Sequence, residues 1–162
     1  MICLPDGEAN NPKKFTLVLF SEFMLKISFE REINGDLEKA FDIITNFENF
    51  QKSFPDFYPS ILIKSVRDES SLVAEHLKLH DTEFIIMSKH FTSKPYSHEM
   101  RVIGGDIKGS GINEIFSFDN GKTLVKVNVE LNVKSSRFSK KNPYGDSWKN
   151  LYNAMMIEIE KS

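Results

Sequence analysis

The chain has 162 residues, a length that suits one domain with a hydrophobic core of its own. Hydrophobic residues make up 40% and charged residues 27%, which excludes a disordered or membrane-spanning chain. The net charge of -2 argues against a nucleic-acid binder, because such proteins usually carry a clear basic excess.

The N-terminal segment differs from the rest of the chain. Residues 1–23 contain prolines, glycine and asparagines that break any periodicity, so we expect a loosely ordered extension or a natural start at Met24. From there Leu25, Ile27 and Phe29 alternate with polar residues, which predicts a strand over Leu25–Ile33. The domain is therefore expected to span residues 24–162.

Two short helices are predicted after this strand. Asn34-Gly35-Asp36 supplies turn and N-cap residues, and apolar residues then recur at helical spacing from Leu37 to Ile44. A second apolar cluster, Phe47, Phe50 and Phe54, ends at Pro55, which cannot continue a helix. The two helices are expected to form a V.

A run of strands separated by turn residues follows. The hairpin at Asn120-Gly121 is the clearest, because these residues accept the positive φ angles of a two-residue turn. This pattern is typical of an antiparallel sheet. The predicted strands are Ile61–Val66, Leu72–Leu79, Phe84–Phe91, Tyr96–Ile103, Ile112–Phe118 and Thr123–Val133.

The chain closes with an amphipathic helix, predicted over Asp146–Lys161 with Asp146 or Ser147 as its cap. One apolar stripe is expected to face the sheet, while Ile157 alone interrupts the polar face. A long helix laid across a sheet leaves room for a hollow. The stripe consists of Trp148, Leu151, Tyr152, Met155 and Ile159.

The segment from Ile33 to Phe41 is followed by the Asn46-Phe47-Glu48-Asn49-Phe50 motif before Pro55. These motifs resemble the START-like, Bet v 1-like (SRPBCC) superfamily, in particular its polyketide cyclase/dehydrase and coenzyme Q-binding branch. The resemblance continues in Pro95, Ile103-Gly104, Gly109-x-Gly111, Phe116 and Asn120-Gly121-Lys122-Thr123-x-Val125. Gln51 departs from the branch, which often has a proline there.

The resemblance implies an α+β helix-grip fold. In that fold a curved antiparallel sheet of about seven strands surrounds the long C-terminal helix, with two short helices after the first strand. The superfamily includes lipid and quinone carriers, a minority of cyclases, and proteins that act on ribosomes or chaperones. Fold alone therefore defines function poorly.

The expected pocket has apolar walls and a few polar groups. Alternation places Tyr96, His98, Met100 and Val102 on one face, where His98 is a candidate for orienting a ligand and Met100 for adapting to its shape. An ordinary structural histidine remains the competing interpretation. The candidate ligand-binding residues are Tyr58, Phe84, Ile86, Tyr96, His98, Met100, Trp148, Tyr152 and Met155.

On two of the predicted strands the pattern does not decide which side chains point inward. In Phe84–Phe91, either the set containing Ser88 and His90 or the set containing Ile85 and Met87 faces the interior. Glu75 and His76 are adjacent on a strand, so at most one of them serves the pocket.

Catalytic motifs, metal motifs and nucleotide motifs are missing from the sequence, so no catalytic residue, metal or cofactor is assigned. We expect a protein that binds a hydrophobic small molecule, such as a lipid, a quinone or a polyketide-like compound. Transport of this molecule is an extension of the same hypothesis. The alternatives are a cyclase- or dehydratase-like enzyme using His98 with Tyr58 or Arg101, and a module that docks on a ribosome or chaperone.

The cellular setting is inferred from one residue. Cys3 cannot form an internal disulfide, so we expect a reducing, cytoplasmic location. We expect a monomer or weak dimer without a nucleic-acid partner. A basic run from Lys134 to Lys141 leaves transient contact with a membrane open.

Overall fold

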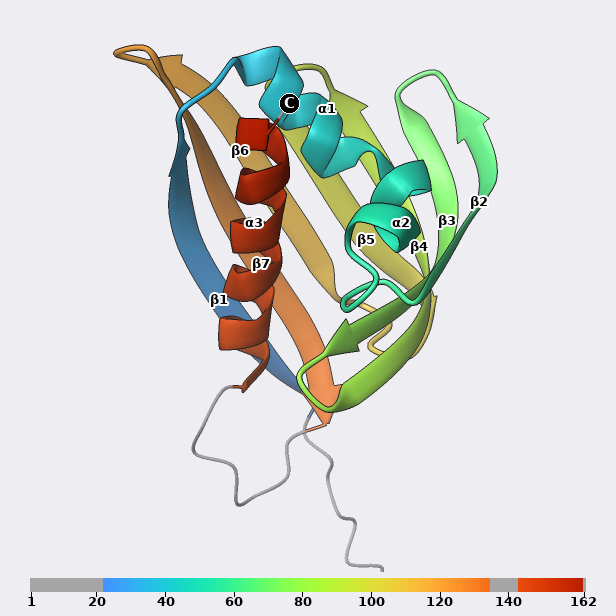
Figure 1. Ribbon diagram of the computed structural model, residues 1–162. Helices are drawn as coiled ribbons and strands as arrows, with labels where there is room; N and C mark the ends of the chain where they lie inside the picture. The colour runs from blue at the N-terminus through green and yellow to red at the C-terminus, as the bar shows by residue number, and fades with distance from the viewer. Residues whose placement is uncertain (1–21, 135–142, 162) are drawn as a thin grey trace, which may run out of the picture.

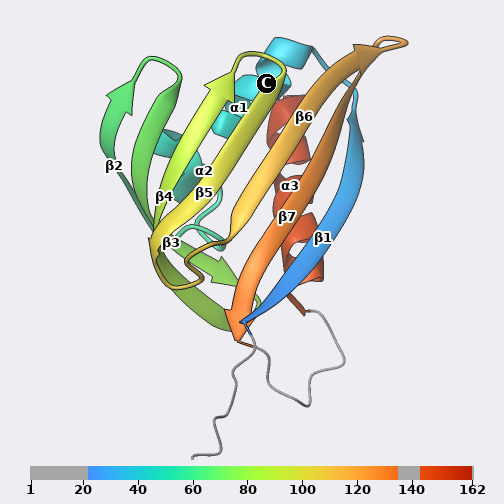
Figure 2. The same cartoon turned by 180° about the vertical axis from the view of Figure 1, so that it is seen from behind.

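The computed structural model describes residues 22–134 and 143–161. Seven antiparallel strands form one curved sheet, and three helices and a short 3-10 helix lie on its concave side (Figures 1 and 2). The α+β helix-grip fold expected from the sequence is confirmed. In chain order the elements are β1 (Glu22–Ile33), α1 (Leu37–Thr45), η1 (Phe47–Asn49), α2 (Phe50–Ser53), β2 (Ser60–Arg67), β3 (Ser70–Leu79), β4 (Thr82–Ser93), β5 (Ser97–Gly105), β6 (Gly111–Asp119), β7 (Lys122–Lys134) and α3 (Pro143–Lys161).

The sheet has the strand order β1-β7-β6-β5-β4-β3-β2. From β2 to β7, strands consecutive in the sequence are neighbours in the sheet, and β1 pairs with β7. From β3 to β7 the strands bury one face and leave the other more exposed, because successive side chains point to opposite faces. In β7, for example, Val125, Val127 and Val129 are buried and the residues between them are exposed.

Helix α3 runs across the concave side of the sheet, beside α1 (Figure 1). The predicted stripe is confirmed, since Trp148, Leu151, Tyr152, Met155 and Ile159 are all buried whereas Ile157 is exposed. Among the helices of the described segments, none combines the length and the apolar character needed to cross a bilayer.

The predicted start of the last helix is wrong, whereas the first helix begins at Leu37 as predicted. Helix α3 begins at Pro143, a residue type favoured in the first helical turn, so Asp146 and Ser147 lie inside the helix and do not cap it. The Ser147 hydroxyl instead accepts a hydrogen bond of 3.0 Å from the backbone N–H of His80. At α1, Asp36 holds the N-cap position, but its side chain makes no capping hydrogen bond.

The first strand begins earlier than predicted. Strand β1 starts at Glu22, where it pairs with Lys134, so two residues before the predicted boundary at Met24 belong to the sheet. The rest of the expected extension lies outside the described residues, as does most of the basic run before α3.

Gly121 offers a clean measure of turn strain. Asn120 and Gly121 both have positive φ, 51° and 77°, as the predicted hairpin turn requires. A Cβ added at Gly121 would meet nothing within 4 Å, so Gly121→Ala is expected to lower the free energy of unfolding by about 1–2 kcal/mol through the backbone alone. Urea denaturation measures this. Gly105→Ala, whose Cβ would collide with the carbonyl of Ile85, should cost more.

Candidate functional site: a buried polar chain

Four neighbouring strands each turn polar side chains toward the concave side. Glu75 comes from β3, Ser88 and His90 from β4, His98 from β5 and Glu114 from β6. All five are buried, with at most 3% of each residue exposed. Such groups require hydrogen-bond partners inside the protein. Strand pairing provides them, since His98 lies directly opposite Glu114.

The side chains form one continuous hydrogen-bonded chain. His90 Nε2 lies 2.6 Å from Glu75 Oε1, and Ser88 Oγ contacts both groups. His90 Nδ1 lies 2.8 Å from His98 Nε2, and His98 Nδ1 lies 3.2 Å from Glu114 Oε1. The order from strand to strand is therefore Glu75, His90, His98, Glu114.

Helices on the concave side complete this chain. The Tyr152 hydroxyl of α3 donates a hydrogen bond of 2.6 Å to Glu114 Oε1. Phe47 of η1 covers the two imidazoles, with ring centroids 4.0 Å from His90 and 5.3 Å from His98. The chain is thus enclosed between the sheet, η1 and α3.

Hydrogen-bond counting assigns a buried proton. The three links from Glu75 through His90 and His98 to Glu114 each need one hydrogen. Two neutral imidazoles supply one each, so the third must come from an imidazolium or a protonated carboxyl group. With two carboxylates at its ends, the complete chain keeps a single negative charge.

Burial lowers the pKa of His90, although Glu75 opposes this shift by accepting a hydrogen bond and by its charge. His90 is therefore a neutral imidazole near pH 7.

The lowered pKa of His90 makes stability depend on pH. Below pH 6.5 the unfolded chain binds a proton at this residue while the folded protein does not, so stability falls as the pH drops from 6.5 toward the folded pKa. The slope is expected to reach at most about 1.4 kcal/mol per pH unit. Urea denaturation between pH 7.5 and 5 measures it. In His90→Gln the slope should become shallower, and an unchanged slope would contradict this assignment.

Two buried tyrosines also face this region. Burial raises the pKa of Tyr58 well above its ordinary value, and the charges of Glu75 and Glu114 add to the effect. Burial likewise raises the pKa of Tyr152, with Glu114 contributing next. Both hydroxyls therefore stay protonated and can act as hydrogen-bond donors.

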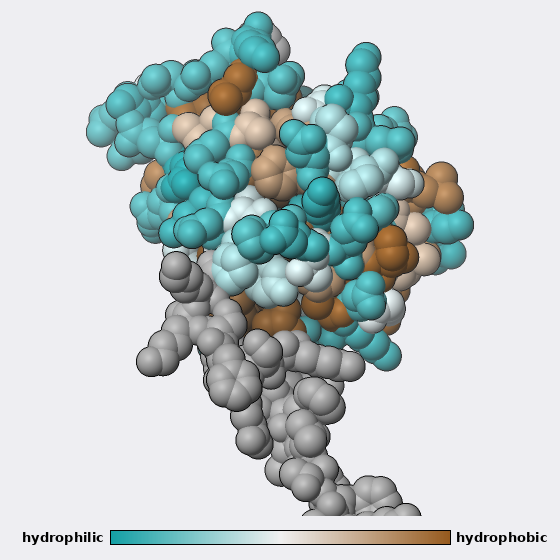
Figure 3. Space-filling view, turned by 60° about the horizontal axis from the view of Figure 1, so that its bottom comes forward, coloured by the Kyte–Doolittle hydropathy of each residue, from teal (hydrophilic) through white to brown (hydrophobic). Residues whose placement is uncertain are grey.

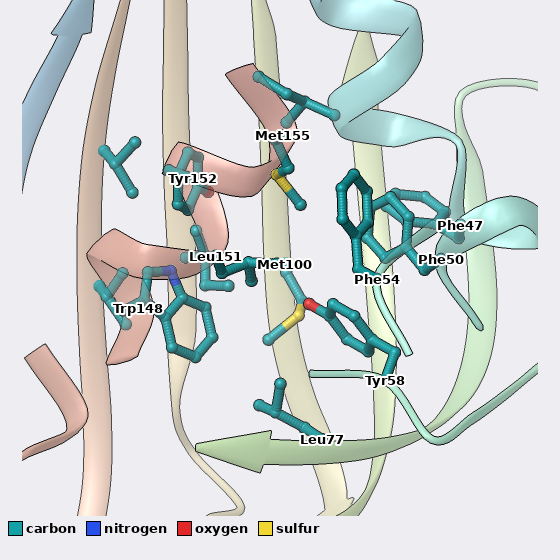
Figure 4. Packing of buried hydrophobic residues seen from close by; sticks show 14 of the residues in the cluster. Phe47, Phe50, Phe54, Tyr58, Leu77, Met100, Trp148, Leu151, Tyr152 and Met155 are labelled. Atoms are coloured by element: carbon teal, nitrogen blue, oxygen red, sulfur yellow. The ribbon is translucent and has the colours of Figure 1, made fainter. Parts of the chain in front are cut away.

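The structure brings together most of the predicted ligand-binding residues. Figure 4 shows the Tyr58 hydroxyl pointing toward Met100, with Trp148, Tyr152 and Met155 of α3 on the other side. The open choice in β4 is settled as well, because Phe84, Ile86, Ser88 and His90 are buried and Ile85 is exposed. Of the adjacent pair on β3, only Glu75 is buried.

Two predicted residues lie elsewhere. Tyr96 is 62% exposed, so its predicted inward position is wrong: it lies in the turn before β5, where strand alternation does not apply. Arg101 is exposed and pairs with Glu99, its guanidinium Nε 2.6 Å from the carboxylate. The suggested pairing of His98 with Arg101 is therefore also wrong.

Glu114 is the main residue that sequence reasoning missed. The alternation of Ile112, Glu114 and Phe116 contained the signal, since a carboxylate sits between two inward apolar residues. Its partner His98 was identified. Both nitrogens of His98 are, however, already engaged by His90 and Glu114, so His98 acts through the chain and not as a free ligand contact.

A hollow of about 930 Å³ opens at the end of the molecule near the start of α3. It lies between the loop from Pro55 to Pro59, the β3–β4 turn at His80 and the first turns of α3. The surface visible from this end is largely hydrophilic, with hydrophobic side chains in separate patches (Figure 3). In the described part of the chain, no group of three His, Cys, Asp or Glu residues is arranged to hold a metal ion.

The curved sheet, the long helix across it and the enclosed interior define a helix-grip protein. Comparison with solved structures identifies this as the fold of the START-like, Bet v 1-like superfamily. A START superfamily protein from Mycobacterium smegmatis matches with a TM-score of 0.72 and 14% identity, over 84% of this chain and 97% of its own. No family model matches the sequence, and no curated protein does.

Two further structures show the range of proteins with this fold. The Zhui aromatase/cyclase from Streptomyces sp. R1128 has a TM-score of 0.66 and 11% identity, over 86% of this chain and 95% of its own. Major latex-like protein 151 from Panax ginseng has a TM-score of 0.68 and 11% identity, over 83% and 97%. At these identities the likeness establishes the fold.

Proposed function

We propose that the protein binds a hydrophobic small molecule between α3 and the concave face of the sheet. The observation that carries this proposal is the polar chain from Glu75 to Tyr152, which lies inside an otherwise apolar interior. Apolar walls supply affinity on binding, and a few buried polar groups set the orientation of the ligand.

The walls contain side chains that can adapt to a ligand. Met100 and Met155 lie between Tyr58 and the helix α3 (Figure 4), and methionine is flexible enough to fit different shapes. The hollow beside Pro55–Pro59 and Ser147 supports access from that end. A lipid, a quinone or a polyketide-like molecule fits this chemistry, and sequestration or transport in the cytoplasm by a monomer or weak dimer is the proposed role.

The first test is whether the purified protein holds a ligand. Native mass spectrometry of freshly purified protein should show a mass above that of the chain, and organic extraction should release a lipophilic compound. The apolar probe N-phenyl-1-naphthylamine should then bind saturably to the extracted protein, with enhanced emission. A protein that shows neither bound mass nor saturable probe binding would overturn the proposal.

A matched pair of variants locates the probe. Met100 is buried on the inner face of β5, near the Tyr58 hydroxyl, whereas Ile103 is exposed on the outer face of the same strand. Met100→Phe should weaken probe binding about tenfold by filling the space, while Ile103→Phe, on the outer face of the same strand, should leave it unchanged. Equal effects from both would place the probe elsewhere.

A second candidate is an enzyme of the cyclase or dehydratase type. It is favoured by the proton shared along the chain, because buried carboxyl and imidazole groups of this kind can exchange protons with a bound carbonyl compound. The Zhui aromatase/cyclase shares the fold. Turnover of a bound ligand that is lost in Glu114→Gln, with ligand binding retained, would favour this candidate over simple binding.

A further inference from the structure

Two polar atoms in the candidate site lack partners. Among the described residues, Glu114 Oε2 and the Trp148 indole Nε1 are fully enclosed yet make no hydrogen bond. Glu114 is 3% exposed and Trp148 is 1% exposed. Leaving a carboxylate oxygen or an indole N–H unpaired inside a protein is unfavourable, so each of them calls for a partner.

The two atoms belong to one place in the structure. The Tyr152 hydroxyl donates to the other oxygen of the Glu114 carboxyl group, and Trp148 lies one helical turn before Tyr152 on the same face of α3. Figure 4 shows the indole nitrogen on the edge of Trp148 that faces Leu151 and Tyr152. The Trp148 indole N–H lies close enough to the Tyr152 hydroxyl to oppose the raised pKa of Tyr152, but it lacks the geometry of a hydrogen bond. An acceptor without a partner and a donor without a well-formed hydrogen bond thus flank the same tyrosine.

The neighbouring groups indicate whether each atom requires a hydrogen-bond donor or an acceptor. Glu114 Oε1 accepts from the Tyr152 hydroxyl and also faces His98 Nδ1, so donors gather on this carboxyl group as they do around a carboxylate. Its free oxygen therefore needs a donor, and the indole N–H needs an acceptor. A hydroxyl group provides both through one oxygen atom. A ligand carboxylate or phosphate would be repelled by Glu114, and an ether or ketone has no hydrogen to donate.

We propose that the ligand is a hydrophobic alcohol or phenol whose hydroxyl group donates to Glu114 Oε2 and accepts from the Trp148 indole N–H. This inference rests on the proposed function and specifies its ligand. The apolar body of the ligand then lies against Leu151, Met100 and Met155, which are buried and lie near Trp148 and Tyr152 in Figure 4.

Calorimetric titration with paired probes tests the proposal. 1-Decanol and 2-naphthol are compared with decyl methyl ether and 2-methoxynaphthalene, which keep the oxygen but lack the donor. Each alcohol or phenol is expected to bind about ten- to a hundredfold more tightly than its ether, because the ether leaves Glu114 Oε2 unpaired in the complex.

Two variants assign the preference to the two atoms. In Glu114→Gln the amide can present a donor at this position, so the preference for the alcohol should shrink to about threefold or less. Trp148→Phe removes the indole donor in a similar shape and should weaken binding of alcohol and ether alike. Glu99→Gln, on the outer face of β5, is the control and should keep the full preference.

The outcomes separate this inference from the proposed function. Equal binding of alcohols and ethers, or an unchanged preference in a folded Glu114→Gln variant, would overturn the hydroxyl assignment. The same holds if neither pair binds while N-phenyl-1-naphthylamine does. Only the failure of all these probes together would also overturn the binding function.

Discussion

Replacing His98 with alanine is expected to lower the free energy of unfolding by about 3–5 kcal/mol. His98 joins His90 Nδ1 to Glu114 Oε1 in the middle of the buried polar chain. Its removal leaves His90 Nδ1 without a partner and takes one donor from Glu114, which keeps the Tyr152 hydroxyl, so the desolvation of these buried groups is compensated less well. Urea denaturation followed by the fluorescence of Trp148, the single tryptophan, measures the change.

The neighbouring residue provides the control for this variant. Glu99 points to the outer face of β5 and pairs there with Arg101, so Glu99→Ala should change stability by less than about 1 kcal/mol. The double variant His98→Ala with Glu114→Gln should lose less free energy of unfolding than the two single variants added together. The reason is that the amide left at position 114 is neutral, so no buried charge loses its partner. A loss below about 1 kcal/mol for His98→Ala would show that the chain contributes little to stability.

Trp148→Ala is expected to have an effect of similar size, about 3–5 kcal/mol. Trp148 is 1% exposed and is the largest side chain that α3 turns toward the sheet. Its removal leaves a cavity that the surrounding sheet can fill only in part. Circular dichroism during thermal or urea denaturation measures the loss without relying on tryptophan emission.

Ile157 on the same helix is the matched control. It is 53% exposed on the opposite face of α3, so Ile157→Ala should stay within about 0.5 kcal/mol of the wild-type stability. Comparable losses for the two variants would contradict the packing of α3 through its Trp148 face.

The fold followed from the sequence because local patterns and turn chemistry agree along most of the chain. The residues of β7 alternate strictly, and Asn120 and Gly121 adopt the positive φ angles that their identity favours. The predicted inward position of Tyr96 was wrong because the alternation of the strand was extended into a turn. The predicted start of α3 was wrong because several residues near Pro143 could begin the helix.

The candidate site was harder to predict than the fold. The alternation of residues could not decide which face of β4 points toward the interior, because both faces carry apolar residues. The burial of Ser88 and His90 depends on partners from other strands, Glu75 and His98, which are 13 and 8 residues away in the sequence. Strand register brings these groups together, and a single sequence does not show register directly.

The course of the polar chain across β3, β4, β5 and β6 has a consequence for folding. If one of these strands paired one residue out of place, its carboxylate or imidazole would turn to the convex side and leave its neighbours stranded in the apolar interior. The side chains of the candidate site therefore also disfavour incorrect pairing of the central strands.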